Sequence, residues 1–302
     1  MNIIDFINIE NTTFCGADCI MCARHDFKLT PEVMSKKLFQ KCIEESANLG
    51  IKQIGIANFG DPLMDKYFIW RIKYIKENYP SIKISLTSTC QLLRGEIADA
   101  VAKYADELLI SMYGFSKIAY ESVHRGSLVY ENVKKNIDDF LARDHRPFCV
   151  MKYLLLDQNK EDMDVWKNYY LSKANRIDIW KPHNFGNFKK NSNIKKQIDK
   201  QNFVGCFRIR LLNGLVFRTN GDVSICCMDY NHNIVVGNIN QNSLTDILNS
   251  KKIQKLQSMN KDKTILNYKY CKNCDQLYDR SEALVYTSND KMRAGQRSSF
   301  IK

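Results

Sequence analysis

Eleven cysteines stand in this chain of 302 residues, and their spacing suggests metal chemistry more than a disulfide framework. Three lie in a C-x3-C-x2-C loop at Cys15, Cys19 and Cys22, and two form a C-x2-C pair at Cys271 and Cys274. The N-terminal residues lack a basic segment followed by an apolar run, so we expect no export signal, a cytoplasmic protein and reduced thiols. Closely spaced reduced thiols bind zinc or an iron–sulfur cluster.

A second group of thiols includes the C-x2-C pair. Cys206 lies upstream of the pair, and Cys226 and Cys227 are adjacent. With Cys271 and Cys274 they can supply four ligands, enough to close a metal site. Either Cys226 or Cys227 can be the fourth ligand. If Cys226 is the ligand, Cys227 is a buried neighbour or a free thiol that faces the substrate.

Three further cysteines stand alone in the sequence. Cys42 falls in a predicted helix and Cys149 in a predicted strand, so we expect both in the core. Cys90 directly follows a predicted strand, which leaves a role in the site open.

The elements that must position these thiols alternate between strand and helix. The predicted strands cover residues 3–10, 51–57, 82–87, 107–112, 148–156 and 177–180, and the predicted helices cover residues 31–49, 64–79, 92–104, 130–142 and 163–172. This alternation predicts an α/β fold with a parallel sheet, open or partly closed. Sites in such sheets lie at the carboxyl ends of the strands. The cysteine loop and the segments FGDP, TSTC and SMYG each follow a strand, so we expect them on one face.

The pattern changes after about residue 203. Residues 208–218 and 222–226 predict a hairpin that turns at Asn220–Gly221. Ser243 is the predicted N-cap of a single helix whose buried positions run to Met259, and a further helix is expected near residues 275–286. We therefore divide the chain into residues 1–202, a small hairpin-plus-helix domain at 203–287, and a mobile polar tail at 288–302.

A three-cysteine loop directly after the first strand resembles the radical S-adenosylmethionine (SAM) superfamily. The resemblance implies a partial (β/α)6 barrel in which Cys15, Cys19 and Cys22 ligate three irons of a 4Fe–4S cluster. SAM would chelate the open fourth iron and be cleaved to a 5′-deoxyadenosyl radical that abstracts a hydrogen atom. A structural zinc site is the alternative, but zinc usually takes four protein ligands.

The same resemblance implies a set of SAM contacts. Gly60, Asp61 and Pro62 match the last three residues of the family's G-G-E-P loop, although Phe59 replaces the first glycine and aspartate replaces glutamate. Arg125 matches a basic residue that pairs with the SAM carboxylate, for which a bidentate guanidinium is suited. Further expected SAM contacts are Ser88, Thr89 and Ser111.

The C-terminal thiols resemble the auxiliary-cluster extension called SPASM or, in its short form, twitch. The resemblance implies one auxiliary 4Fe–4S cluster, ligated by Cys206, Cys226, Cys271 and Cys274, and therefore two clusters in the chain. A four-cysteine zinc knuckle is the alternative at this site.

The form with one auxiliary cluster resembles radical SAM dehydrogenases of aminocyclitol antibiotic biosynthesis. There the radical takes a carbinol hydrogen, a base removes the hydroxyl proton, and the auxiliary cluster accepts the electron. Lys152, Tyr153 or His183 could be that base. The related alternative is an epimerase, in which a thiol such as Cys227 or Cys90 returns hydrogen to the opposite face.

A third alternative is maturation of a ribosomal peptide. Such enzymes often carry an N-terminal peptide-recognition domain, for which we expect no room before the first strand, so a small substrate is favoured. The resemblance also implies an electron donor such as flavodoxin or ferredoxin.

The net charge of +12 bears on the partners. It favours an anionic or nucleotide-linked sugar, because basic surfaces attract anions. We place the expected contact at Lys189, Lys190, Lys195, Lys196 and Lys200. The longest apolar stretch, residues 148–156, is too short to span a membrane, and nucleic acid is not an expected partner.

Overall fold

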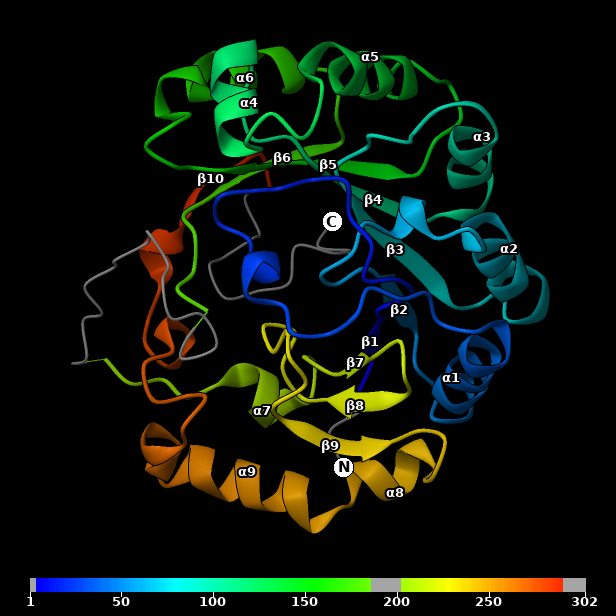
Figure 1. Ribbon diagram of the computed structural model, residues 1–302, viewed down its shortest axis with the longest axis vertical. Coiled ribbons are helices and arrows are strands. Elements are labelled where there is room, and N and C mark those ends of the chain that lie inside the picture. Colours follow the sequence, from blue (N-terminus) through cyan, green and yellow to red (C-terminus); the bar gives the residue numbers. More distant parts are fainter. Residues whose placement is uncertain (1–3, 186–201, 290–302) are drawn as a thin grey trace.

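The computed structural model describes residues 4–185 and 202–289, and six parallel strands form the centre of its fold (Figure 1). They pair in sequence order from β1 to β6. The strands are β1 (Phe6–Ile9), β2 (Gln53–Ile56), β3 (Lys83–Ser88), β4 (Glu107–Ser111), β5 (Phe148–Leu154) and β6 (Arg176–Trp180). Most of their side chains are buried on both faces, as expected for parallel strands that are covered by helices.

Helices connect these strands and lie on the outside of the curved sheet (Figure 1). They are α1 (Lys36–Asn48), α2 (Phe68–Asn78), α3 (Gly95–Tyr104), α4 (Lys117–Val123), α5 (Tyr130–Leu141) and α6 (Met163–Tyr170). Ser35 caps α1 by accepting a 3.2 Å hydrogen bond from the Leu38 amide. Helix α4 was not predicted from the sequence, since it is short, but Ser116 caps it in the same way. The predicted strand–helix alternation is otherwise confirmed.

The C-terminal part extends the same sheet at both edges. It contains α7 (Phe207–Leu211), β7 (Val216–Phe217), β8 (Asp222–Ser224), β9 (Val235–Asn238), α8 (Leu244–Leu248), α9 (Lys251–Lys261) and β10 (Leu284–Thr287). Strand β7 pairs in parallel with β1, and β8 and β9 follow in antiparallel order. Strand β10 pairs antiparallel with β6 at the opposite edge. The described strands thus form one ten-stranded sheet.

Three expectations for the C-terminal part are wrong in detail. Residues 208–211 belong to helix α7, which ends at Leu212 in a left-handed conformation, so the predicted hairpin contains only β7 and β8. The single predicted helix after Ser243 is two helices, because Ser250 accepts a hydrogen bond from the Ile253 amide and starts α9. The segment 275–286 forms two 3₁₀ turns and strand β10 instead of a helix.

The start of the predicted tail is also fixed to the sheet. The Ser288 amide donates to the Ile177 carbonyl at 3.1 Å, and the Ser288 hydroxyl accepts from the Ile177 amide at 3.0 Å. Residues 290–302 lie outside the described residues, as do Lys189, Lys190, Lys195, Lys196 and Lys200. The division of the chain at residues 202 and 287 remains a proposal.

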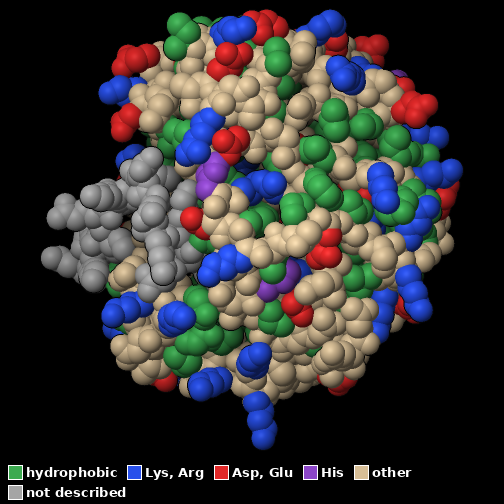
Figure 2. Space-filling view, in the orientation of Figure 1, with side chains coloured by type: hydrophobic (Ala, Val, Ile, Leu, Met, Phe, Trp, Pro, Cys, Tyr) green, Lys and Arg blue, Asp and Glu red, His purple; other side chains and the backbone are tan. Residues whose placement is uncertain are grey.

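Two surface properties bear on possible partners. No helix in residues 4–185 or 202–289 is long and apolar enough to cross a membrane. Figure 2 shows Lys and Arg side chains scattered over the visible face and interspersed with Asp and Glu, without a single basic patch.

Candidate active site

The three-cysteine loop follows β1 and is docked on the C-terminal end of α4 and the residues directly after it. All eleven cysteines are free of disulfides, and Cys15, Cys19 and Cys22 are half-buried. The Ile20 amide donates to the Val123 carbonyl at 2.9 Å. Cys19 Sγ lies 3.1 Å from Nδ1 of His124, a buried residue that the sequence analysis did not identify. These contacts fix the loop at the carboxyl end of the sheet.

The donor set of this loop fits an iron–sulfur cluster. Burial raises the pKa of Cys15 to about 11 and also raises that of Cys19, so proton loss from these thiols needs a compensating cation. The charges of Cys22 and Cys15 also raise the pKa of Cys19, so the three thiols lie close to one another. No three His, Cys, Asp or Glu side chains among the described residues are arranged to hold a single metal ion. A 4Fe–4S cluster binds each thiolate to a different iron.

Asp61 binds Ser88 and Thr89, and all three residues were predicted to contact SAM. Its carboxylate accepts hydrogen bonds from the Ser88 hydroxyl at 2.8 Å and from the amide and hydroxyl of Thr89 at 2.9 and 2.7 Å. It also accepts a bond from the Leu63 amide at 3.1 Å. The acid therefore ties the loop after β2 to the end of β3.

Gly60 permits the loop after β2 to pack directly on the cysteine loop. A Cβ at this position would collide with the carbonyl oxygen of Thr12 and lie 2.9 Å from that of Phe14. The Asp61 amide donates to the same Phe14 carbonyl at 2.8 Å. Pro62, also predicted, is buried at the start of the next 3₁₀ turn. The residues Gly60, Asp61 and Pro62 thus lie beside the three-cysteine loop.

Phe59, which departs from the family pattern, has a packing role. Its ring lies 5.5 Å from Phe27, 5.8 Å from Tyr230 and 6.5 Å from Phe185, measured between centroids. The four rings join the cysteine loop, the loop after β2, the segment after β6 and the segment after β8. A glycine in place of Phe59 would remove the central ring of this aromatic group.

The remaining two predicted SAM contacts lie near the same loop. Ser111 ends β4 and is buried. Arg125 adopts a positive φ of 50° and extends toward the cysteine loop, where its Nη1 lies 3.8 Å from an oxygen of Asp18. Its guanidinium is half exposed, so it remains available to a bound carboxylate.

The C-terminal thiols form a second group around the start of α7. Burial and the thiols of Cys227, Cys206 and Cys274 raise the pKa of Cys226, and Cys206 and Cys274 act in the same way on Cys271. The five thiols therefore lie close together. This fits the expected auxiliary cluster, and the choice between Cys226 and Cys227 as fourth ligand stays open.

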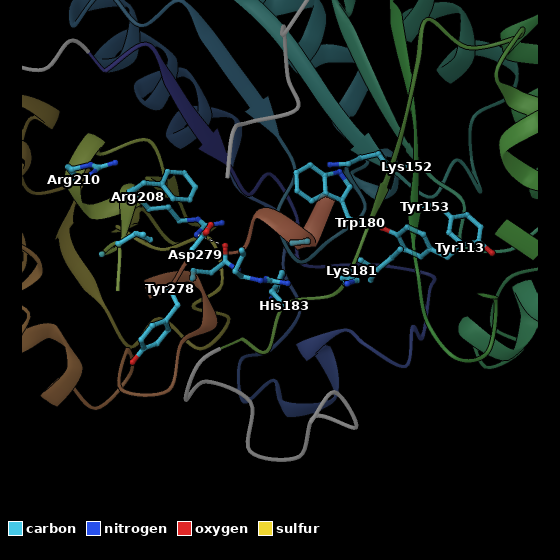
Figure 3. A pocket seen from close by; sticks show the side chains of 17 residues that line it. Tyr113, Lys152, Tyr153, Trp180, Lys181, His183, Arg208, Arg210, Tyr278 and Asp279 are labelled. Atoms are coloured by element: carbon cyan, nitrogen blue, oxygen red, sulfur yellow. Dashed lines mark hydrogen bonds between the residues drawn. The ribbon is translucent and has the colours of Figure 1, made fainter. Parts of the chain in front are cut away.

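A cavity of about 590 Å³ lies between the barrel and the C-terminal part. Figure 3 shows that one wall comes from the ends of β5 and β6, with Lys152 and Trp180, and the other from α7, with Arg208. Gly205 and Phe207 line the cavity and flank Cys206 in the sequence. The cavity therefore adjoins the auxiliary thiols.

Tyr113 connects the same cavity to the first group of thiols. It lines the cavity, and its ring stacks on His124 with centroids 5.9 Å apart and planes 10° apart. Burial raises the pKa of Tyr113 to about 12, and the charges of Cys19 and Cys22 contribute. Neighbours of both groups of thiols, Tyr113 for the first and Gly205 and Phe207 for the second, thus line one cavity.

Of the candidate bases, Lys152 is the best placed. Burial lowers the pKa of Lys152, although the acids Asp178 and Glu107 oppose that shift, so the amine loses its proton more readily than an exposed lysine. Tyr153 also borders the cavity, but its hydroxyl donates to the Asn159 carbonyl at 2.6 Å and its ring packs on Trp166 of α6.

His183 and the candidate thiols differ in their access to the cavity. His183 lines it, and burial lowers the pKa of its imidazole to about 4, which makes it a weak base at neutral pH. Cys90, Cys42 and Cys149 are fully buried in the hydrophobic core, as expected for the latter two. Cys227 is half-buried among the auxiliary thiols and Cys90 is fully buried, and neither is among the residues that line this cavity.

The sequence alone did not identify Tyr113, His124 or Arg208. Tyr113 was included in the SMYG segment, but nothing in the pattern set it apart. His124 directly precedes Arg125, and Arg208 follows Cys206 by two residues. Proximity to a predicted ligand was the one signal that could have found them.

Comparisons with known proteins agree with this geometry. The family model of the radical SAM superfamily matches residues 9–168, and that of SPASM, an iron–sulfur cluster-binding domain, matches residues 206–275. No curated protein sequence matches the chain.

Solved structures share the fold at low sequence identity. BtrN in complex with AdoMet and 2-DOIA is 18% identical with a TM-score of 0.61, over 90% of this chain and 92% of BtrN. Streptococcus suis SuiB bound to precursor peptide SuiA is 15% identical with a TM-score of 0.70, over 92% of this chain and 71% of SuiB. Native anSMEcpe with AdoMet and Cp18Cys peptide is 12% identical with a TM-score of 0.66, over 92% of this chain and 91% of that one.

These findings confirm the predicted family, fold class and cofactors, which are SAM and 4Fe–4S clusters. They do not choose among substrates, because the similar structures hold both a small molecule and peptides. The chain is a member of the radical SAM superfamily with a C-terminal SPASM domain.

Proposed function

We propose that this protein is a dehydrogenase that oxidises a carbinol of a small sugar- or cyclitol-like substrate. The observation that carries the proposal is a cavity of about 590 Å³ that has Lys152 in its wall, Gly205 and Phe207 on either side of Cys206, and Tyr113 toward the first group of thiols. A volume of this size suits a small polar ligand. The small molecule in the BtrN complex supports the same substrate class.

The proposed reaction divides the two electrons and two hydrogens of a carbinol among three acceptors. SAM and a cluster held by Cys15, Cys19 and Cys22 would supply a radical for the carbon-bound hydrogen atom, and an auxiliary cluster held by the C-terminal thiols would supply an acceptor for the remaining electron. Lys152 accepts the hydroxyl proton, and the product is a ketone. Tyr113 and Trp180 line the space in which the carbinol would lie.

The residues on the face of the cysteine loop would hold SAM. Gly60, Asp61 and Pro62 present the backbone of the loop after β2, and Arg125 would pair with the carboxylate of SAM. Flavodoxin or ferredoxin would supply the electron that starts each turnover.

Lys152→Gln tests the proposed base. With a panel of sugars and cyclitols, we expect the variant to cleave SAM but to form at least 100-fold less ketone, since general bases contribute about 10²–10⁴-fold. In the wild type kcat/KM should rise with pH through the lowered pKa of Lys152, because only the neutral amine accepts a proton. Tyr153→Phe is the matched control and should retain both the rate and the pH profile. Normal ketone formation by Lys152→Gln would contradict the assignment.

Two other reactions remain distinguishable from the proposed one. Peptide maturation is supported by the fold shared with SuiB and anSMEcpe, and it would give a modified peptide and no ketone from the panel. Epimerisation would be redox-neutral and would place solvent deuterium in the product. In that case Cys227→Ala should stop incorporation of deuterium while SAM cleavage continues.

A further inference from the structure

The cavity wall carries far more positive than negative charge. Of the seventeen lining residues, Asp279 is the one acid. The cationic residues are Lys152, Lys181, Arg208, Arg210 and Arg280. Low-dielectric walls strengthen the positive field of these five side chains, so the cavity disfavours a cationic ligand and favours an anionic one.

Some of these cations are already engaged by the protein. Arg280 pairs with Asp275 at 3.0 Å and donates to the Pro182 carbonyl at 2.9 Å. Lys152 is under the influence of the buried acids Asp178 and Glu107. The positive charges of Arg280 and Lys152 are therefore partly balanced by acids of the protein itself.

The other three cations have no acidic partner within residues 4–185 and 202–289. Arg208 makes one long hydrogen bond, 3.4 Å to the Gln276 side chain. The aliphatic part of the Arg208 side chain packs against Gly214, where a Cβ would collide with it. Arg208 also adjoins the auxiliary thiols, two residues after Cys206, so part of its charge serves them. Lys181 and Arg210 lie on opposite walls of the cavity, with Arg210 beyond Arg208 (Figure 3).

Unfilled hydrogen-bonding atoms lie in the same wall. Trp180 Nε1 and His183 Nδ1 are buried, and neither has a hydrogen-bond partner among the described residues. A buried polar atom without a partner costs about 1–3 kcal/mol, a cost that a polar ligand can remove. Both residues belong to the barrel wall that also carries Lys181.

We propose that the substrate carries an anionic oxygen group, a phosphate ester or a carboxylate, which Lys181 holds at the barrel wall in the positive field of Arg208 and Arg210 across the cavity. The polar body of the substrate then lies along Trp180 and His183. This inference rests on the proposed function for its site and names the substrate class of that site. It assigns the contact to the described cavity, whereas the sequence had suggested the lysines at 189–200.

Binding of three probes to the reconstituted, full-length protein tests the proposal. Glucose 6-phosphate, glucuronate and glucose share a sugar ring and differ in charge, and calorimetry under anaerobic conditions measures each Kd. We expect one or both anions to bind at least tenfold more tightly than glucose, and the tighter anion identifies phosphate or carboxylate. Equal binding of all three, or no binding of either anion at millimolar concentration, would overturn the proposal.

Lys181→Gln with Arg210→Gln locates the site. We expect the double variant to bind the tighter anion about tenfold or more weakly while its affinity for glucose stays unchanged. Arg94→Gln with Lys103→Gln is the matched control, because it removes two positive charges at α3, outside the cavity lining. Equal weakening by both double variants would mean general attraction by net charge and would refute the site.

The binding result is independent of turnover. If the anions bind through Lys181 and Arg210 but the enzyme forms no ketone from sugars, the anion site stands and the dehydrogenase proposal is refuted. Ketone formed from a neutral sugar by an enzyme that binds neither anion would refute this proposal and leave the dehydrogenase standing.

Discussion

Asp61 shows how one side chain can hold together two loops of the proposed SAM site. Its carboxylate accepts four hydrogen bonds, from Leu63, Ser88 and both donors of Thr89. Ionised carboxylates that accept several protein donors hold loops strongly, because each such bond is charge-assisted. The substitution of aspartate for the family's glutamate therefore fits a shorter reach between these two loops.

Asp61→Asn should weaken both the loop and SAM binding. The amide has a single acceptor oxygen for donors that now meet two, so we expect a loss of about 1–3 kcal/mol, the cost of leaving a buried donor unpaired. Thermal unfolding and the Kd of SAM measure the two effects. Thr89→Ser keeps the hydroxyl and the amide and should behave as the wild type, whereas Thr89→Val should show part of the loss. Unchanged SAM affinity in Asp61→Asn would rule out this role.

The thiols allow a count of the clusters and of their ligands. We expect roughly eight irons per chain after anaerobic reconstitution, because two four-iron clusters are bound. Changing Cys15, Cys19 and Cys22 together to Ala should leave about half the iron and abolish SAM cleavage. SAM cleavage by this triple variant would contradict the assignment of the first cluster.

Cys226→Ala and Cys227→Ala should resolve the fourth auxiliary ligand by the same iron measurement. Only the variant that lacks the ligand should lose auxiliary iron or change its electron paramagnetic resonance spectrum. Equal retention of auxiliary iron in both variants would mean that the two thiols can replace each other.

At the scale of elements, a polar network joins β1 to the segment around β8. Glu10, at the end of β1, accepts hydrogen bonds from the Asn58 side chain at 3.0 Å and the Phe59 amide at 3.3 Å, and Arg218 lies 3.5 Å away. His232 lies between Glu10 and Asp222, at 3.9 and 3.4 Å. Arg218 also donates to the Cys226 carbonyl at 3.2 Å, so the network reaches the auxiliary loop.

The His232 network gives a pH dependence of stability with a definite sign. Burial acts to lower the pKa of His232, but Asp222 and Glu10 outweigh it and the pKa is raised. Hydrogen bonding from His232 lowers the pKa of Asp222 to about 2. The stabilisation from His232 is therefore fully present below the unfolded value of about 6.5 and is lost as pH rises through the raised pKa.

His232→Asn should thus lower the melting temperature more at pH 6 than at pH 9. Asparagine tolerates the left-handed conformation that His232 adopts, so backbone strain does not confuse the result. His25→Asn, at a partly exposed histidine of the cysteine loop, is the control for a general effect of losing an imidazole. An equal loss at both pH values would mean that the charge of His232 contributes nothing.

The sequence predicted the barrel elements well and the C-terminal elements poorly, for a physical reason. Parallel strands that are buried on both faces, such as β4 and β5, have nearly continuous apolar sequences, which makes them easy to recognise. Helix α7 has only five residues, too few for a helical period to stand out, and strand β10 forms by pairing with β6, which lies about a hundred residues earlier. The predicted thiols could be found because their chemistry needs local spacing, whereas the cavity residues Tyr113 and Arg208 meet only in the fold.

At the scale of the whole molecule, the C-terminal strand secures the cavity wall. Strand β10 pairs with β6, and Thr287 donates a 2.8 Å hydrogen bond to the buried Asp178. Asp178 acts in turn on Lys152, the proposed base, and β6 leads into Trp180 and Lys181 at the cavity. The last described strand therefore supports residues that come more than a hundred positions earlier in the chain.

Ending the chain after Ala283 should consequently damage the site as well as the fold. The deletion removes the β10 pairing and leaves Asp178 without Thr287, so we expect at least about 2 kcal/mol of lost stability, or a melting temperature lower by about 4–8 °C. Binding of the glucuronate or glucose 6-phosphate probe should weaken too, because β6 loses its neighbour. Ending the chain after Asn289 is the matched control, since it keeps β10 and the contacts of Ser288, and it should leave both measurements unchanged. A chain ended after Ala283 that melts and binds like the control would show that β6 holds the cavity wall without β10.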